Sequence, residues 1–265
     1  METIKLGGVT LGAGKPKICV PLMAFDKDEL VRQARAAETL PCQLLEFRAD
    51  PLGKEGWRDR QALAEMTHAI KEVTQKPLIL TIRTADEGGL ARMTRTEYYS
   101  LLRDLAEDAA CEAIDIEPFD TDADFDEERI RFLASCVQEE GKKVIFSNHD
   151  FSGTPDVDVM VRRLYIMQEL GADIPKIAVM PHSEDDVINL LTAACVMRDE
   201  YAKRPFIALS MGELGKETRI CGGEFGSCIT FASGGASLQM GESAPGQMDA
   251  ATLDAYICAY YGDKL

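Results

Sequence analysis

Short apolar runs alternate with longer amphipathic stretches from Lys17 to the end of the chain. The short runs are rich in Val, Ile, Leu and Phe, a composition typical of parallel strands that are buried on both faces. Because strand and helix signals alternate, the pattern predicts parallel strands joined by helical crossovers. The predicted strands are Ile18–Met23, Leu44–Ala49, Leu78–Thr84, Ala113–Glu117, Val144–Asn148, Lys176–Met180, Phe206–Met211 and Cys228–Ala232.

The connections between these strands have helical periodicity. The helices predicted from it are Lys27–Thr39, Asp59–Thr74, Thr96–Asp108, Glu127–Glu140, Asp156–Leu170, Glu184–Tyr201 and a last one over Met248–Tyr260. The segment after the seventh strand has a weaker pattern and predicts a short helix. The first sixteen residues, with a glycine-rich turn at Leu11–Gly14, are expected to form a β-hairpin across the bottom of the fold.

Eight strand and helix units in a chain of 265 residues indicate a (β/α)8 TIM barrel. A doubly wound open sheet uses the same alternation, so the count and the length favour the closed barrel without excluding the open one. No linker or low-complexity segment interrupts the pattern. We therefore expect residues 1–265 to form one domain.

Composition and charge exclude several classes of partner. A formal net charge of −16, with no basic cluster, opposes binding to nucleic acid. The N-terminus lacks a signal peptide and no apolar stretch could span a bilayer, so we expect no membrane partner and a cytoplasmic location. The eight scattered cysteines indicate reduced thiols. Without paired cysteines or clustered histidines, we expect no metal.

Charged residues end four successive predicted strands. They are Glu46 and Arg48 after the second, Arg83 and Glu87 after the third, Asp115 and Glu117 on the fourth, and His149 after the fifth. A single one of these is most often a solvated loop residue. In a (β/α)8 barrel, however, catalytic groups come from the carboxyl ends of the strands. Four such ends together are costly to desolvate unless the groups pair with one another or with a ligand.

Lys176 has the most informative surroundings. It lies in DIPKIAVMP, among apolar residues where a barrel strand is buried on both faces. A buried lysine with an uncharged amine can attack a carbonyl. The alternative is that Lys176 begins the strand and points to solvent at the bottom of the barrel, and the pattern alone does not distinguish the two.

His149 is the candidate general base, because an imidazole transfers protons readily near neutral pH. This role needs a carboxylate to hold the ring, and Glu87, Asp115 or Glu117 could supply it. A structural histidine at a strand end is the alternative. His68 and His182 are expected on the surface.

Two further segments bear on a ligand site. SMGELGKETRI lacks the spacing of a phosphate-binding P-loop, but its Arg219 could bind a carboxylate through two hydrogen bonds. Ser233–Gln247 is small, polar and without hydrophobic period, as expected of a lid over the barrel mouth. A solvated connection to the last helix would have the same composition.

The runs EFRAD, TIRTADEGG, SNHDF, GADIPKIAVMP, EFGS and SAPGQ occur in order between Glu46 and Gln247. Together they resemble the type I 3-dehydroquinate dehydratases. The resemblance implies a TIM barrel, commonly a homodimer, that removes water from 3-dehydroquinate by syn elimination through an imine in the shikimate pathway. No cofactor is expected.

The resemblance also implies roles for individual residues. Lys176 matches the Schiff-base lysine, His149 the general acid/base, and Glu87 the carboxylate beside it, with Asp115 or Glu117 supporting the histidine from behind. The residues that match substrate-binding positions are Glu46, Arg48, Arg83, Arg219, Ser243 and Gln247.

Two other functions use the same features. A class I aldolase also forms an imine on a barrel lysine, but many such aldolases bind phosphate through glycine-rich loops after the last strands, of which Gly234 and Gly235 are the one hint here. A ligand-binding barrel without catalysis is the other alternative. A turnover assay distinguishes it from an enzyme.

Overall fold

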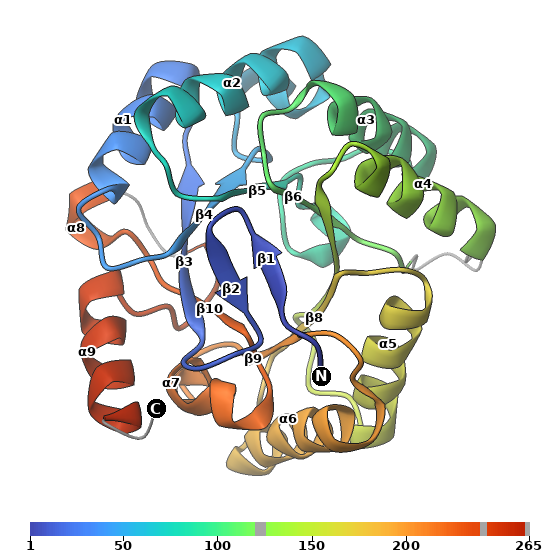
Figure 1. The fold of residues 1–265 in the computed structure, drawn as a ribbon, viewed down its shortest axis with the longest axis vertical. Coiled ribbons are helices and arrows are strands. Elements are labelled where there is room, and N and C mark those ends of the chain that lie inside the picture. The colour runs from blue at the N-terminus through green and yellow to red at the C-terminus, as the bar shows by residue number, and fades with distance from the viewer. Residues whose placement is uncertain (120–125, 239–242, 263–265) are drawn as a thin grey trace.

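Eight parallel strands surrounded by helices form the body of the computed structural model, which describes residues 1–119, 126–238 and 243–262 (Figure 1). In sheet order the strands are β10 (Ile229–Phe231), β3 (Lys17–Met23), β4 (Leu44–Arg48), β5 (Leu78–Thr81), β6 (Ala113–Ile116), β7 (Lys143–Asp150), β8 (Ile174–Val179) and β9 (Ile207–Ser210). The two edges of this sheet meet at a parallel bridge between Phe206 and Ser227, next to a 2.8 Å hydrogen bond from the Cys228 amide to the Phe206 carbonyl. The predicted barrel is confirmed, and the open sheet is excluded.

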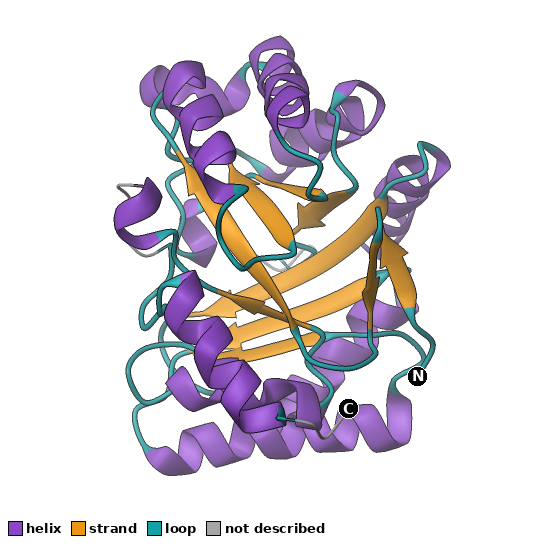
Figure 2. Ribbon diagram, turned by 60° about the vertical axis from the view of Figure 1, so that its left-hand side comes forward, coloured by secondary structure: helices purple, strands orange, loops and turns teal. Residues whose placement is uncertain are grey.

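The helices form an outer ring around the strands (Figures 1 and 2). They are α1 (Lys27–Ala37), α2 (Arg60–Val73), α3 (Arg95–Asp108), α4 (Glu127–Glu139), α5 (Val157–Glu169), α6 (Glu184–Val196), the short α7 (Lys216–Cys221) and α8 (Gly235–Leu238), and α9 (Ala250–Tyr261). Shorter helical turns are η1 (Gly53–Arg58), η2 (Ala85–Glu87), η3 (Met197–Tyr201) and η4 (Gly222–Phe225). The predicted helix over 184–201 is confirmed, although its last turn widens into the π-helix η3.

Side chains at helix ends explain several of the boundaries. Thr94 and Ser183 each form a capping box at the start of α3 and α6, accepting a hydrogen bond from the third amide of the helix. Asp26 and Asp59 cap α1 and α2 in the same way with one carboxylate oxygen. The polar pattern of the chain therefore specifies where these helices begin.

The hairpin is present, but the predicted turn is wrong. Its strands are β1 (Ile4–Leu6) and β2 (Val9–Leu11), and Gly7 and Gly8 join them. Leu6 and Leu11 are both fully buried against the inner residues of the barrel, which requires the turn between them. The hairpin closes the barrel at the amino ends of the strands (Figure 1). There Gly7 lies next to Pro77 and Gly12 next to Pro205.

Alternation along each strand separates two apolar layers. On β4, Leu44 belongs to the layer inside the barrel, while Leu45 and Phe47 pack outward against the helices. Glu46 and Arg48 follow Leu44 at every second position, so they face inward above it. The same alternation on each strand brings polar side chains together inside the carboxyl end of the barrel.

Two findings concern the surroundings of the protein. No helix among the described residues has the length and apolar character needed to cross a bilayer. All eight cysteines are unpaired.

Candidate active site

One pocket at the carboxyl ends of the strands gathers nine of the ten predicted site residues. Its volume is about 520 Å³, counting its open side, and the nine are Glu46, Arg48, Arg83, Glu87, His149, Lys176, Arg219, Ser243 and Gln247. The tenth, Asp115, is buried next to the pocket and bonds to two of its residues. Apolar side chains, among them Leu209, Met211 and Phe231, form much of the remaining wall.

Lys176 points into the barrel. Strand β8 begins at Ile174, two residues before the predicted start, so Lys176 is its third residue. Ile174 and Ala178 on either side of it belong to the inner apolar layer, and the period of two then places Lys176 on the same face. The side chain is 6% exposed. The alternative of a lysine facing solvent at the bottom of the barrel is excluded.

The ammonium group of Lys176 has two partners. Its Nζ lies 3.2 Å from Oδ2 of Asp115 and 4.6 Å from the centre of the Phe231 ring. The carboxylate and the ring face both attract positive charge on this nitrogen. The site is therefore suited to hold a cation at Nζ, whether an ammonium or a protonated imine.

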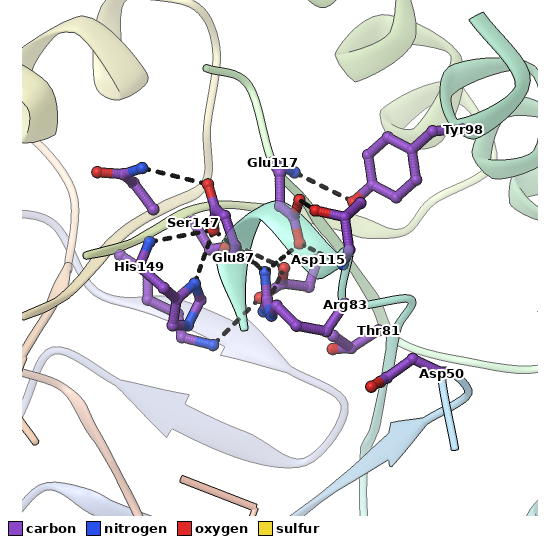
Figure 3. A network of polar contacts seen from close by, with 12 residues as sticks. Asp50, Thr81, Arg83, Glu87, Tyr98, Asp115, Glu117, Ser147 and His149 are labelled. Carbon is purple, nitrogen blue, oxygen red and sulfur yellow. Dashed lines mark hydrogen bonds and ion pairs between the residues drawn. The ribbon is translucent and has the colours of Figure 1, made fainter. Parts of the chain in front are cut away.

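His149 is held by Glu87 (Figure 3). Its Nδ1 lies 2.8 Å from Oε2 of Glu87, and the same oxygen accepts the backbone N–H of His149 at 3.0 Å. Because Oε2 of Glu87 acts as an acceptor toward the backbone N–H, we assign it the same role toward the ring and place the ring proton on Nδ1. The lone pair of Nε2 is then available to take a proton. Glu87 comes from η2, directly after the third barrel strand.

The pKa of His149 lies well below its ordinary value. Burial is the largest cause, and the positive charges of Arg83, Lys176 and Arg48 act in the same direction. At neutral pH the imidazole is therefore uncharged, which is the form that a general base requires.

Asp115 lies between Lys176 and Arg83. Its carboxylate accepts hydrogen bonds from Lys176 at 3.2 Å, from Arg83 at 2.9 Å and from the Ser147 hydroxyl at 2.6 Å, whereas Glu87 holds the histidine directly. Burial would raise the pKa of Asp115, but the charges of Arg83 and Lys176 and these hydrogen bonds lower it overall. Asp115 is thus an anion that binds the lysine directly and is linked to Glu87 only through Arg83.

Arg83 connects the carboxylates of the site (Figure 3). Its guanidinium lies 2.9 Å from Asp115, 2.8 Å from Glu117 and 3.5 Å from Glu87. Asp115 and Glu117 both bind Arg83, so these contacts do not choose between them as the carboxylate behind His149, and Glu117 is fully buried. Arg83 was predicted to contact substrate; it lines the pocket, and it also compensates these buried charges.

Glu46 and Arg48 are held by residues that sequence reasoning missed. Oε1 of Glu46 accepts the Thr81 hydroxyl at 2.8 Å, and the Arg48 guanidinium forms two hydrogen bonds to Asp50, at 2.7 and 2.9 Å. Thr81 lies two positions before Arg83, so the alternation along the strand already indicated that it faces inward. Asp50 follows strand β4, and the sequence gives no sign that it binds Arg48.

Arg219 comes from α7 and is almost fully buried. Its guanidinium donates to the carbonyls of Phe231 at 3.3 Å and Pro245 at 3.1 Å, so it joins the last strand to the predicted lid. Ser243 and Gln247 hydrogen bond to each other, and Arg48 donates to the Ser243 carbonyl at 3.4 Å. Ser243 and Gln247 therefore line the pocket; residues 239–242 of the predicted lid are outside the described part of the chain.

The other two histidines, His68 and His182, are exposed, as predicted. Within residues 1–119, 126–238 and 243–262, no three histidine, cysteine or carboxylate side chains are grouped so that they could hold a metal ion.

Comparison with known proteins connects this geometry to an activity. The sequence profile of the type I 3-dehydroquinase family matches residues 18–263. The chain belongs to this family. Similar proteins include the 3-dehydroquinate dehydratases of Clostridium novyi, 41% identical over 96% of each chain, and of Bacillus licheniformis, 41% identical over 95% of each chain. As a type I 3-dehydroquinase, the enzyme is a hydro-lyase that removes water from 3-dehydroquinate.

Solved structures of the family have the same fold. The type I 3-dehydroquinate dehydratase of Clostridium difficile, in complex with covalently modified comenic acid, superposes with a TM-score of 0.88 at 33% identity over 98% of each chain. The 3-dehydroquinate dehydratase of Enterococcus faecalis gives a TM-score of 0.86 at 34% identity, covering 97% of this type I 3-dehydroquinase and 99% of that chain.

The aldolase alternative receives support from the fold alone. A phospho-2-dehydro-3-deoxyheptonate aldolase from Thermotoga maritima has a TM-score of 0.59 with 13% identity. Such a likeness shows a shared barrel and carries no information on the reaction. The type I 3-dehydroquinase activity is what the matched family supports.

Proposed function

We propose that the enzyme dehydrates 3-dehydroquinate through an imine on Lys176, with His149 as general acid and base. The observation that carries this proposal is that a buried lysine and a carboxylate-bound histidine line the same pocket. The Clostridium difficile relative, with its covalently modified comenic acid, supports a covalent route in the family.

Imine formation is the first step. The amine of Lys176 adds to the C3 carbonyl of the substrate, and the carbonyl oxygen leaves as water with two of the three protons of the original ammonium. His149 carries a proton between the nitrogen and the oxygen. The protonated imine that remains has its positive charge beside Asp115 and over the Phe231 ring, where the lysine ammonium had been.

Elimination follows from the electron demand of the imine. His149 removes a proton from C2, and the electron pair of that C–H bond forms an enamine. The enamine then expels the C1 hydroxyl, which takes the proton from His149 and leaves as water. Hydrolysis of the conjugated imine returns the ketone product and the lysine amine, so that all atoms and protons balance.

The other residues of the pocket orient the ring before any bond changes. Arg219 is assigned to the substrate carboxylate, which it would bind through two charge-assisted hydrogen bonds. Glu46, Arg48 and Arg83 are assigned to the substrate hydroxyls and ring. Ser243 and Gln247, which sit above the pocket, are assigned to the closed lid.

Borohydride tests the imine step. Incubation with borohydride and 3-dehydroquinate together is expected to inactivate the enzyme irreversibly, because hydride reduces the imine to a stable secondary amine. Borohydride without substrate is the control and should leave activity unchanged. Full recovery of activity after dialysis of the substrate-treated sample would contradict the proposal.

The assignment of Arg219 predicts a binding defect. Arg219→Lys keeps the positive charge but loses the planar pair of donors. KM for 3-dehydroquinate is therefore expected to rise about 10- to 100-fold, which corresponds to the binding free energy of one hydrogen bond to a charged group. The measurement is steady-state kinetics, with Arg32→Lys at an exposed position of α1 as control. A KM equal to that of the control would remove Arg219 from the substrate site.

We also propose that the enzyme is a cytoplasmic homodimer in which each chain is one domain. The unpaired cysteines support a reducing compartment. Pairing of β10 with β3 supports one domain, because the last strand completes a sheet begun by the first. Sedimentation equilibrium should give twice the chain mass of 29.1 kDa, and thermal unfolding a single transition; a monomer or two transitions would contradict these assignments.

A further inference from the structure

A chain of hydrogen bonds runs from helix α5, outside the barrel, to the ring of His149. Nη1 of Arg163 donates to Oδ1 of Asn148 at 3.0 Å, and Nδ2 of Asn148 donates to Oε1 of Glu87 at 3.1 Å. The other oxygen of Glu87 binds His149. Arg163 thus reaches the histidine through two intermediate side chains, although it lies on the outer layer of the fold.

The order of donors in this chain fixes the orientation of the amide. An asparagine has a donor end and an acceptor end of nearly equal size, so either end could face Glu87. The guanidinium of Arg163 has donors alone and therefore binds the oxygen end. The Asn148 amide N–H is then turned toward the carboxylate, and the reverse orientation would place two acceptor oxygens against each other.

A second cavity borders this chain of hydrogen bonds. It encloses about 1030 Å³, counting its open side, and is lined by Glu87, Asn148, His149, Phe151 and Arg163 among others. It shares Glu87, His149 and Phe151 with the substrate pocket. Arg163 also lies 3.5 Å from Asp150, a contact that is partly exposed and worth little by itself. Solvent therefore reaches Arg163 from a side separate from the substrate pocket.

We propose that Arg163 and Asn148 are positioning residues that fix the carboxylate of Glu87, and through it the imidazole of His149, for proton transfer. The inference rests on the proposed role of His149 as acid and base. Both residues act through Glu87 and need no contact with the substrate. Arg163 determines the orientation of the Asn148 side-chain amide. In that orientation Asn148 donates a hydrogen bond to Glu87.

Charge around Glu87 explains why the donor is needed. The charged groups that act on the pKa values of Glu87 and His149 include Arg48, Arg83, Asp115, Glu117 and Lys176, and Asp86, Arg95, Asp150 and Arg163 line the second cavity with them. Burial, followed by the negative charge of Glu117, raises the pKa of Glu87, whereas Arg83 and the Asn148 hydrogen bond lower it. Without the Asn148 donor, the Glu87 and His149 pair takes up a proton at higher pH and loses its basic form.

Arg163→Gln tests the inference against a matched control. We expect kcat to fall roughly tenfold, which is less than the loss expected when a general base is removed, and KM to stay unchanged. The acid limb of the pH profile of kcat should move to higher pH. Imine trapping with borohydride should be retained. The control is Arg162→Gln, since Arg162 is the exposed neighbour on α5 and lines a groove with Tyr165 and Tyr201.

Asn148→Asp is the second variant. It has the same size and keeps a partner for Arg163, but it replaces the donor that faces Glu87 with an acceptor. It should lower kcat at least as much as Arg163→Gln and move the acid limb in the same direction. Arg163→Lys, which unlike glutamine has donors alone and keeps the positive charge, should recover part of the loss.

His149→Ala, measured in parallel, separates the two proposals. If His149→Ala is inactive while Arg163→Gln and Asn148→Asp have the kcat and pH profile of Arg162→Gln, the positioning inference is overturned and the role of His149 stands. If His149→Ala retains full turnover, the proposed function fails first. Should either variant change KM and thermal stability with no change in the pH profile, Arg163 and Asn148 are structural and the inference is overturned.

Discussion

Lys176→Arg is expected to lower turnover of 3-dehydroquinate by at least about 10⁴-fold, as removal of a covalent nucleophile does. A guanidinium stays protonated in proteins and cannot form an imine. It nevertheless keeps a positive charge beside Asp115, whose anion lies 3.2 Å from the lysine nitrogen. The variant therefore separates loss of the nucleophile from the cost of an uncompensated buried carboxylate.

Lys176→Met and Lys203→Met complete this test. Lys176→Met removes the charge as well, and we expect the same loss of turnover with lower thermal stability than Lys176→Arg. Lys203 is 70% exposed and pairs with Glu169 on the surface, so Lys203→Met should retain full activity. Turnover by Lys176→Arg within tenfold of the unmodified enzyme would rule out an obligatory imine.

His149→Ala is expected to lower kcat by about 10³-fold, within the range for a general acid or base. Because Lys176 remains, the variant should still bind 3-dehydroquinate and accumulate a trappable imine. The measurement combines steady-state kinetics with the mass of the borohydride-treated protein. The two readouts distinguish loss of proton transfer from loss of the site.

The control for this variant is a histidine elsewhere on the chain. His182→Ala removes an exposed imidazole whose Nε2 lies 2.8 Å from the Ser152 carbonyl, and it should leave kcat unchanged. Loss of both ligand binding and imine formation in His149→Ala would show that His149 is structural. The histidine would then have no part in the proton transfers assigned to it.

Cationic side chains outnumber carboxylates in the pocket of this acidic chain. The net charge is −16, yet Arg48, Arg83, Lys176 and Arg219 line the site beside only two carboxylates, Glu46 and Glu87. The carboxylates of Asp50, Asp115 and Glu117 compensate the first three from outside the pocket lining. Local arrangement rather than net charge therefore decides that an anionic substrate can bind here.

The barrel could be predicted because its signals are local. Each strand is a short apolar run, and capping residues such as Thr94 and Ser183 mark helix starts. The hairpin turn was misplaced because Gly12 and Gly14 resemble a turn as closely as Gly7 and Gly8 do. The tertiary requirement that Leu6 and Leu11 both enter the barrel decides between them.

Partners within the site could not be predicted in the same way. The sequence pattern left the direction of Lys176 open because it depends on whether the strand begins at residue 174 or 176. The choice between Asp115 and Glu117 as the carboxylate behind the histidine stayed open as well, because a strand's carboxylate can reach groups on several other strands. The link from Arg163 to Glu87 joins a helix to a loop about 76 positions earlier in the chain, and no local pattern reports such a contact.

Peptide mapping after borohydride reduction in the presence of 3-dehydroquinate locates the imine directly. We expect one added ligand mass per chain, carried by the peptide that contains Lys176 and absent from Lys176→Arg. Modification of a different lysine, or no added mass in an enzyme that turns over, would contradict the imine at Lys176.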